Sequence, residues 1–157
     1  DVLGRVTVPR TIHQAKFSMG TVLGLIALHG KAGLTEFHQV PLDDTDVARF
    51  RDNVSMVLDA EVDAAYPLRW LGRVEVETVD GRRLQGAIDE PKGDPGNTLS
   101  RPELEQKFRR LAAFSEALND DQTDTLIERV WHLNEDAPLH FAIATAATPD
   151  DEHQETL

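Results

Sequence analysis

One stretch of this chain limits its possible folds more than any other: the nearly continuous apolar run from Met19 to Leu28. Only Gly20, Thr21 and Gly24 interrupt the run, so large apolar side chains would cover almost the whole circumference of a helix. A helix that is apolar on all sides is normally buried. The run is also too short to span a bilayer, which takes about 20 apolar residues. It therefore predicts the central core helix of a soluble domain.

Both ends of this helix carry recognisable signals. Ser18 is a suitable N-cap, and Gly30 stands where a left-handed C-terminal cap is expected. Gly20 and Gly24 lie one turn apart and lower the helix propensity. Their spacing predicts close approach of another backbone on that face, with a cofactor pressed against the glycines as the alternative.

The charge of the chain narrows the classes of partner. The formal net charge is −12, which disfavours phosphate backbones and anionic membranes, so we expect neither nucleic acid nor membrane as a partner. The absence of cysteine excludes disulfides and fits a reducing compartment, so we expect a cytoplasmic location. No leader or transmembrane span is visible. Because the sequence opens at Asp1 without an initiator Met, we expect it to come from a longer polypeptide.

The remainder of the first hundred residues predicts short elements around the core helix. Alternation over 2–8 predicts a strand that Pro9 ends, and 11–15 reads as a polar connector. Thr35 is expected to cap a helical turn that carries Phe37. A further helix should begin within 43–46, where acidic residues favour a helix N-terminus.

Strands are expected next. The segment Ser55–Asp63 is predicted to be a strand that Tyr66-Pro67 ends, and 69–79 and 82–88 are predicted to form a hairpin. A three-residue turn pairs Val76 with Leu84 and keeps the apolar faces of both strands together, whereas a two-residue turn would place Glu77 opposite Leu84. The predicted turn is type I, with Gly81 left-handed in a bulge.

The C-terminal third predicts two helices. After a loop at 91–98, Ser100 and Glu103 form a capping box for a helix with an apolar stripe, and Asn119 or Asp120 caps a second helix. The short link makes the pair an antiparallel hairpin. The stripe of the first helix consists of Leu104, Phe108, Leu111 and Leu118, and the buried side of the second of Leu126, Ile127, Val130, Trp131 and Leu133.

After this hairpin the pattern weakens. The apolar segment 137–147 can be a docked helix, an extended segment or disordered, and 149–157 reads as a loose acidic tail. The predicted fold class is α+β: an antiparallel sheet packed on a buried helix, followed by a C-terminal helical hairpin. The predicted domains are 1–98, 99–135 for the hairpin, and 136–157 for the tail.

Few residues suggest chemistry. No two of the six histidines have a helix-face metal spacing, so we expect no metal site. Asp59, Glu61 and Asp63 alternate on the predicted strand, where they form either a weak cation site or simply a solvated face.

The best candidate for a binding site precedes the core helix. Lys16, Ser18 and His13 cluster there, and a helix N-terminus attracts anions, so these residues could hold a substrate carboxylate. The alternative is that Ser18 only caps the helix and Lys16 is solvated.

Three sequence motifs together indicate a family. They are QAKFSMGTVLGLIALHGKAGLTEF, a V-E-V-x-x-x-D-G hairpin, and GDPGNTLSRPELEQKFRRLA. From Val6 to about Leu133, the chain resembles the MmgE/PrpD family, which includes 2-methylcitrate dehydratase, cis-aconitate decarboxylase and iminodisuccinate epimerase.

The resemblance implies a lyase or isomerase of small polycarboxylates that uses no cofactor and is a homodimer. It also implies a large helical domain and a smaller α+β lid, with the active site in the cleft between them. Residues 1–98 then correspond to the latter part of the lid, and 104–133 to helices that close the helical domain.

The same resemblance limits what can be assigned. The principal acid and base residues of the family would precede Asp1, in a helical half present in cis or in trans. A lid tyrosine of the decarboxylase branch would align near Leu3, which is not a tyrosine, so the catalytic residues remain unknown. Two hypotheses result: the C-terminal part of such an enzyme, inactive without its helical half, or a non-catalytic α+β interaction module that retains the lid fold.

Overall fold

The computed structural model describes residues 8–133, and the statements below concern those residues. The chain divides into two compact units, Asp1–Thr98 and Leu99–Leu157. The predicted α+β class is confirmed: helices accompany a two-stranded antiparallel sheet, and the C-terminal helices follow it. The strand predicted over 2–8 (Val8 excepted), the segment 137–147 and the tail 149–157 lie outside the described residues.

No helix within residues 8–133 combines the length and the hydropathy needed to cross a membrane.

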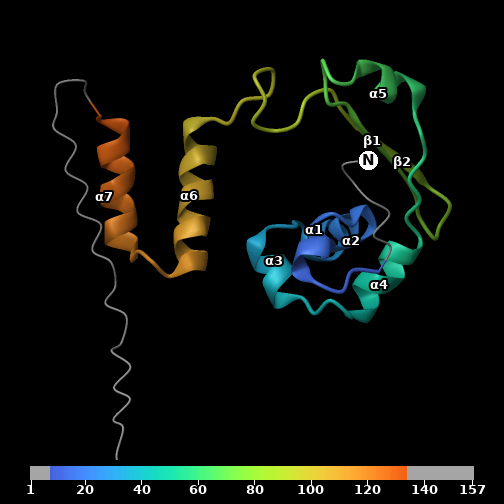
Figure 1. The fold of residues 1–157 in the computed structure, drawn as a ribbon, viewed down its shortest axis with the longest axis horizontal. Helices are drawn as coiled ribbons and strands as arrows, with labels where there is room; N and C mark the ends of the chain where they lie inside the picture. The colour runs from blue at the N-terminus through green and yellow to red at the C-terminus, as the bar shows by residue number, and fades with distance from the viewer. Residues whose placement is uncertain (1–7, 134–157) are drawn as a thin grey trace, which may run out of the picture. The chain divides into compact units, whose positions relative to one another are not determined.

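Four helices open the first unit (Figure 1). They are α1 (Ile12–Lys16), α2 (Met19–His29), α3 (Leu34–Gln39) and α4 (Thr45–Asp52). Each contributes one residue to a shared apolar core, formed by Ala15, Leu25, Phe37 and Val47. The core is thus small, and it holds four short elements that would be only marginally stable in isolation.

The predicted caps of the apolar helix are both present. Ser18 is the N-cap of α2, and its side chain accepts a hydrogen bond from the backbone N–H of Thr21. Gly30 ends the helix in the left-handed region with φ 79°, and its N–H donates to the carbonyl of Ile26 at 2.8 Å. These caps satisfy backbone groups that a helix leaves without partners at its ends.

The two glycines of α2 face α4, as the prediction of a close backbone approach requires. A Cβ at Gly20 would lie 2.7 Å from Cγ of Arg51 and 3.1 Å from its carbonyl oxygen. At Gly24 the nearest atoms are Cγ1 and the carbonyl oxygen of Val47, both at 3.4 Å. The glycines therefore serve helix packing, with the backbone of α4 in the place of the alternative cofactor.

The prediction that α2 is buried on all sides is wrong for this chain. Thr21, Gly24 and Leu25 are buried, whereas Ile26 and Leu28 are 44% and 47% exposed. The physical reason is that α2 packs mainly against α1 and α4, and the described elements of the first unit leave Ile26 and Leu28 partly exposed.

Two local predictions near this core also need correction. The predicted polar connector is helix α1, whose N-cap Thr11 accepts a hydrogen bond from Gln14 N–H at 3.1 Å. Thr35 lies inside α3 rather than at its cap, because Gly33 is the N-cap and the Glu36 carboxylate accepts its N–H at 2.9 Å.

The strand predicted over Ser55–Asp63 is not formed. Its second half is helix α5 (Ala60–Ala65), capped by the Asp59 carboxylate, which accepts the N–H groups of Glu61 and Val62. Its first half belongs to no strand, and Val57 is 85% exposed. A local side-chain cap thus determines the conformation where no neighbouring strand is paired.

The hairpin has the predicted register. Strands β1 (Gly72–Glu77) and β2 (Arg83–Ile88) pair Val76 with Leu84 and Val74 with Gly86. The three-residue turn is closed by hydrogen bonds from Thr78 N–H to the Arg82 carbonyl at 2.9 Å and from Gly81 N–H to the Thr78 carbonyl at 2.8 Å. Gly81 has a φ of 82°, which confirms the left-handed bulge.

The second unit contains α6 (Arg101–Ser115) and α7 (Asp120–Trp131), an antiparallel pair with the predicted caps at Ser100 and Asn119 (Figure 1). Arg109 forms an ion pair with Asp124, and the Arg101 guanidinium lies 4.7 Å from the centroid of the Trp131 ring. The predicted buried side of the second helix is only partly buried.

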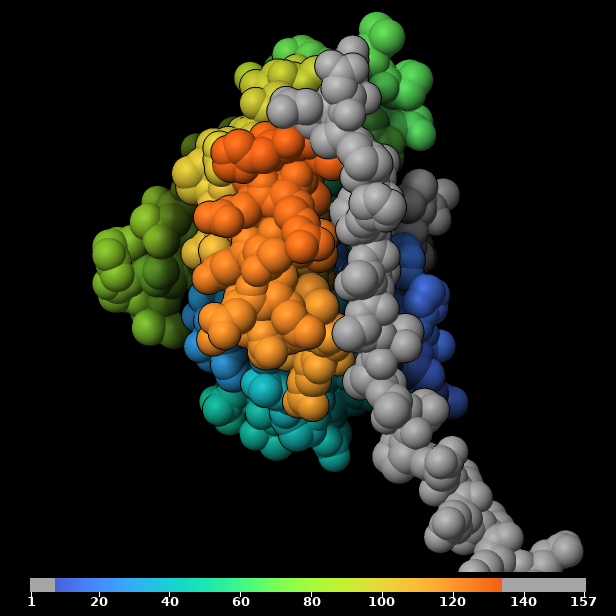
Figure 2. Space-filling model, turned by 90° about the vertical axis from the view of Figure 1, so that its left-hand side faces the viewer, coloured from blue at the N-terminus to red at the C-terminus, as the bar shows by residue number. Residues whose placement is uncertain are grey.

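Ile127 is buried within the pair, but other members of the apolar stripes are open to solvent. The space-filling view in Figure 2 shows the outer surface of α7 in orange. The exposed fractions are 40% for Leu104, 42% for Leu111, 47% for Val130, 38% for Trp131 and 47% for Leu133.

The α2–α4 contact predicts different effects on stability for two similar substitutions. Gly20→Ala should lower the free energy of unfolding by about 1–3 kcal/mol, because the new methyl would overlap Cγ of Arg51 and crowd its backbone carbonyl. Gly24→Ala should stay within about 1 kcal/mol of the parent, because its gain in helix propensity offsets a tighter contact. Chemical denaturation of both variants tests this, and equal losses would contradict the α4 packing.

The turn predicts a specific cost at Gly81. Gly81→Ala should destabilise the chain by about 1–2 kcal/mol, because a Cβ is unfavourable at positive φ. Gly81→Asn should cost less, since asparagine tolerates the left-handed region. Denaturation midpoints measure both, and an alanine variant as stable as the parent would rule out the bulge.

Candidate functional site

The predicted binding segment lies around the turn between α1 and α2. His13 and Lys16 belong to α1, and Ser18 follows at the start of α2. The segment is positioned by the Thr11 cap and by a hydrogen bond from Arg10 N–H to the Gln14 side chain at 2.8 Å. The structure thus brings all three predicted residues to one turn.

Ser18 has a well-defined structural role. It is 1% exposed, and its oxygen accepts hydrogen bonds from the Thr21 N–H at 3.4 Å and the Thr21 hydroxyl at 2.9 Å. These contacts favour the alternative that Ser18 caps the helix. A direct contact between its hydroxyl and a ligand stays a prediction.

His13 and Lys16 lie on the solvent side of the same turn. The His13 ring is 5.1 Å from the Phe17 ring, and Lys16 Nζ is 6.0 Å from the centroid of the Phe37 ring. The Lys16 ammonium is at the outer limit of a cation–π contact and stays exposed to water. Both side chains are therefore accessible to a dissolved anion, and Lys16 offers it a positive charge.

Sequence reasoning overlooked Glu36, a buried carboxylate next to Phe37. Glu36 is 8% exposed, accepts the Gly33 N–H, and pairs with Lys31 Nζ at 3.3 Å. Burial raises the pKa of this carboxyl, but hydrogen bonds from the Gly33 and Glu36 backbone and the Lys31 ammonium outweigh it and lower the pKa below its usual 4.5. Glu36 is thus a permanent anion at neutral pH that holds the Gly30–Leu34 turn against α3.

A weak signal for Glu36 was present in the sequence. A capping residue followed three positions later by glutamate is typical of a helix start. Gly33 and Glu36 have that spacing. Thr35 was predicted as the cap instead, because threonine is a more usual capping residue than glycine.

The acidic trio does not form the cation face considered above. Asp59 caps α5, Glu61 and Asp63 lie within the helix, and Arg73 of β1 pairs with Asp59 at 3.7 Å and Glu61 at 3.0 Å. Over residues 8–133 no cluster of three histidine, aspartate or glutamate side chains is arranged to hold a metal ion. The histidines His140 and His153 lie outside those residues.

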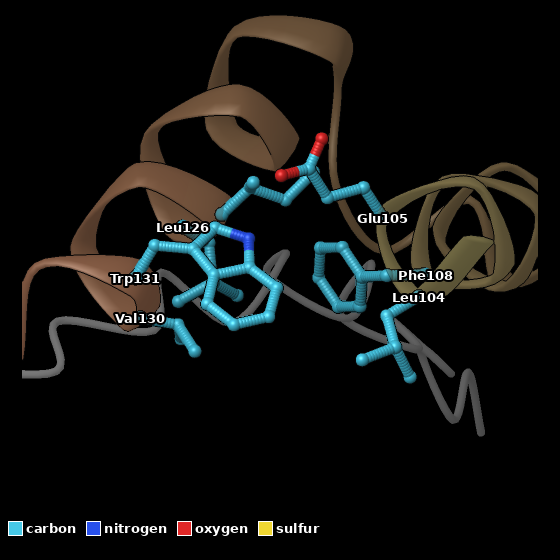
Figure 3. Close-up of a pocket in the computed structure, with 7 residues that line it drawn as sticks. Leu104, Glu105, Phe108, Leu126, Val130 and Trp131 are labelled. Carbon is cyan, nitrogen blue, oxygen red and sulfur yellow. The ribbon is translucent and has the colours of Figure 1, made fainter. Parts of the chain in front are cut away.

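The second unit contains a site of another kind, an apolar pocket of about 290 Å³ between α6 and α7. Figure 3 shows the Trp131 and Phe108 rings facing one another across it. Its lining consists of Leu104, Glu105, Phe108, Leu126, Ile127, Val130 and Trp131. The carboxylate of Glu105 is engaged by Arg101 at 2.8 Å, so the pocket suits an apolar group rather than a charged substrate.

The comparisons with known proteins address the whole described region. The sequence pattern of the MmgE/PrpD C-terminal domain matches residues 1–133. A search of curated proteins finds no significant match. The matched residues include both the turn with Lys16 and the α6–α7 pair.

The lowered pKa of Glu36 predicts an acid-sensitive contribution to stability. A carboxylate with a depressed folded-state pKa stabilises the fold fully above its unfolded-state value near 4.5, and the contribution is lost as the pH falls through the lower folded-state value. Glu36→Gln should therefore flatten the acid side of the curve of unfolding free energy against pH.

Denaturant titrations between pH 7 and acid pH measure this slope. Asp63→Asn, at an exposed position of α5 in the same unit, is the control and should change the slope less. If Glu36→Gln leaves the slope unchanged, the pKa of the Glu36 carboxyl does not differ between the folded and the unfolded chain, and the prediction is wrong.

Proposed function

We propose a function from one premise: the chain belongs to the MmgE/PrpD family, and residues 1–133 are its C-terminal domain. The proposal is that the chain is the C-terminal part of an enzyme that acts on a small polycarboxylate, by dehydration, decarboxylation or epimerisation, without a cofactor. Residues 1–98 would supply the latter part of a lid, and 99–135 the closing helices of a helical domain. The family match carries this proposal.

The uncovered apolar surface supports the need for a further half. The apolar side chains of Ile26 and Leu28 on α2 are partly exposed to solvent, and so is that of Leu111 on α6. Exposed apolar surface of this kind favours association with other elements. A preceding helical half, in cis or in trans, is the partner that the family organisation suggests, and a homodimer is part of the same proposal.

The chemistry proposed for this part of the enzyme is substrate holding. Each of the three reactions needs a base beside an acidic carbon and cations for the carboxylates. With a net charge of −12, the chain attracts an anionic substrate only through local positive groups. Lys16 and His13 are exposed at the α1–α2 turn, and Ser18 orders the start of α2, whose partial positive charge adds to that of the Lys16 ammonium.

The proposal predicts no turnover by residues 1–157 alone. Loss of a positioned base removes a factor of about 10²–10⁴ in rate, and without the other half the substrate is also not oriented. Assays with 2-methylcitrate, cis-aconitate and iminodisuccinate should therefore be negative for this chain and positive once the helical half is added. Turnover by the purified chain would place the chemistry on its own residues, and a negative mixture would favour the non-catalytic module.

Kinetics of the reconstituted enzyme test Lys16 itself. Lys16→Ala should raise the apparent KM, because a carboxylate contact is lost, and Lys16→Arg should restore part of it. Lys107→Ala removes an exposed lysine of α6 and is the matched control. Equal KM values for the parent and Lys16→Ala would assign Lys16 to the solvated surface.

A further inference from the structure

The turn of the β1–β2 hairpin contains a pair of residues that is prone to a spontaneous rearrangement of the backbone. Asp80 directly precedes Gly81, and the sequence contains no second Asp-Gly pair and no Asn-Gly pair. In such a pair the glycine nitrogen can reach the side-chain carboxyl carbon of the aspartate, because glycine has no Cβ in the way. Both residues are exposed to water, and apart from its chain neighbours no atom lies within 4 Å of the position that a Cβ of Gly81 would take.

The rearrangement requires water as its only co-reactant. A bond forms between the Gly81 nitrogen and the Asp80 carboxyl carbon, and the proton of that nitrogen leaves with the carboxyl hydroxyl as water, so that a succinimide ring remains. Water then opens the ring, and when it breaks the bond to the main-chain carbonyl carbon the product is isoaspartate. No electron is transferred. The backbone of the turn becomes one carbon longer, which would disturb the register that pairs Val76 with Leu84.

Three contacts of the folded turn oppose this attack. The Thr78 hydroxyl donates a hydrogen bond to one oxygen of the Asp80 carboxylate, and Nε of Arg82 donates to the other at 2.8 Å. The Gly81 N–H donates to the Thr78 carbonyl at 2.8 Å. The nitrogen must give up this proton to attack, and the carboxylate must gain a proton to lose an oxygen as water. The contacts therefore stabilise both groups in their unreactive forms.

The same contacts keep the Asp80 carboxyl ionised. The hydrogen bond from the Thr78 hydroxyl is the main reason that its pKa lies below the usual 3.8, and Arg82 lowers this pKa further. An ionised carboxylate reacts poorly with a nucleophile, because the attack would place more negative charge on it. The neighbouring Arg83 pairs with Glu77 at 3.4 Å instead, so the two adjacent arginines have different partners.

We propose that Asp80-Gly81 is a latent isomerisation site and that Thr78 and Arg82 protect it. The turn needs glycine at this position, since Gly81 has a φ of 82°, and the aspartate before it would be a liability without these contacts. The two side chains thus preserve the covalent structure of the hairpin as well as its conformation. This role is independent of the proposed enzymatic function.

Isomerisation can be measured on the purified chain, incubated at neutral pH in water labelled with heavy oxygen. Each passage through the succinimide adds one labelled oxygen at residue 80, and peptide mapping separates aspartate from isoaspartate. The folded chain should isomerise more slowly than the same chain unfolded in guanidinium chloride, where the contacts are lost. Equal rates in the folded and the unfolded chain would overturn the proposal.

Substitutions at the two protecting residues should speed up isomerisation of the folded chain. Arg82→Gln and Thr78→Val should each raise the rate about fivefold, which is the change expected for one hydrogen bond of ordinary strength. Two controls should isomerise as slowly as the parent: Arg83→Gln removes the same charge from the neighbouring position, and Thr78→Ser retains the hydroxyl. An unchanged rate in Arg82→Gln or Thr78→Val, or a raised rate in either control, would overturn the proposal.

Hydrogen exchange of the Gly81 N–H separates protection of the carboxylate from loosening of the turn. This amide should stay as protected in Arg82→Gln as in the parent, because its acceptor is the Thr78 carbonyl rather than the arginine. Faster isomerisation with unchanged amide protection would support the role of the contacts to Asp80. Faster isomerisation that occurs only together with loss of amide protection would overturn it.

Discussion

The contact of α4 with the glycine face of α2 is the constraint on which the first unit depends. Gly20 and Gly24 let the Arg51 and Val47 backbone approach α2 at distances that a Cβ would obstruct at Gly20. This approach brings Leu25 and Val47 into one apolar cluster, to which α1 and α3 add one buried residue each. The cluster that α1 and α2 share also holds the turn with His13, Lys16 and Ser18 in place, together with the local hydrogen bonds of Thr11 and Gln14.

Local signals predicted the structure well wherever one side chain or one backbone conformation decides it. The caps at Ser18, Gly30 and Asn119 follow from unsatisfied backbone groups, and the hairpin register follows from keeping Val76 opposite Leu84. The strand predicted over 55–63 was wrong. Its β propensity would take effect only through packing against neighbouring strands, whereas the Asp59 cap stabilises a helix without any partner strand.

The binding role of the turn with His13, Lys16 and Ser18 stays a prediction, and the contacts of its residues could not be predicted from the sequence. The polar cluster before an apolar helix was visible from residue types, but the burial of Ser18 and the engagement of its hydroxyl by Thr21 depend on how α2 packs. Glu36 was missed because its importance comes from two partners, Lys31 and the Gly33 N–H, that a turn brings together. A sequence pattern gives the type and spacing of residues, but the burial of a side chain and its pairing with a partner depend on how the chain packs.

The exposed side of α2 shows that burial cannot be predicted from residue type alone. The composition of α2 predicts burial on all sides, and within the described part of the first unit α2 packs mainly against α1 and α4. An apolar face of a helix indicates a surface that is normally buried, but it does not identify the element that covers it. For α2, residue type therefore overestimates burial at Ile26 and Leu28, which are apolar but about half exposed. By the same reasoning, α6 and α7 carry apolar side chains, such as Leu111 and Val130, on sides that the helix pair itself leaves exposed.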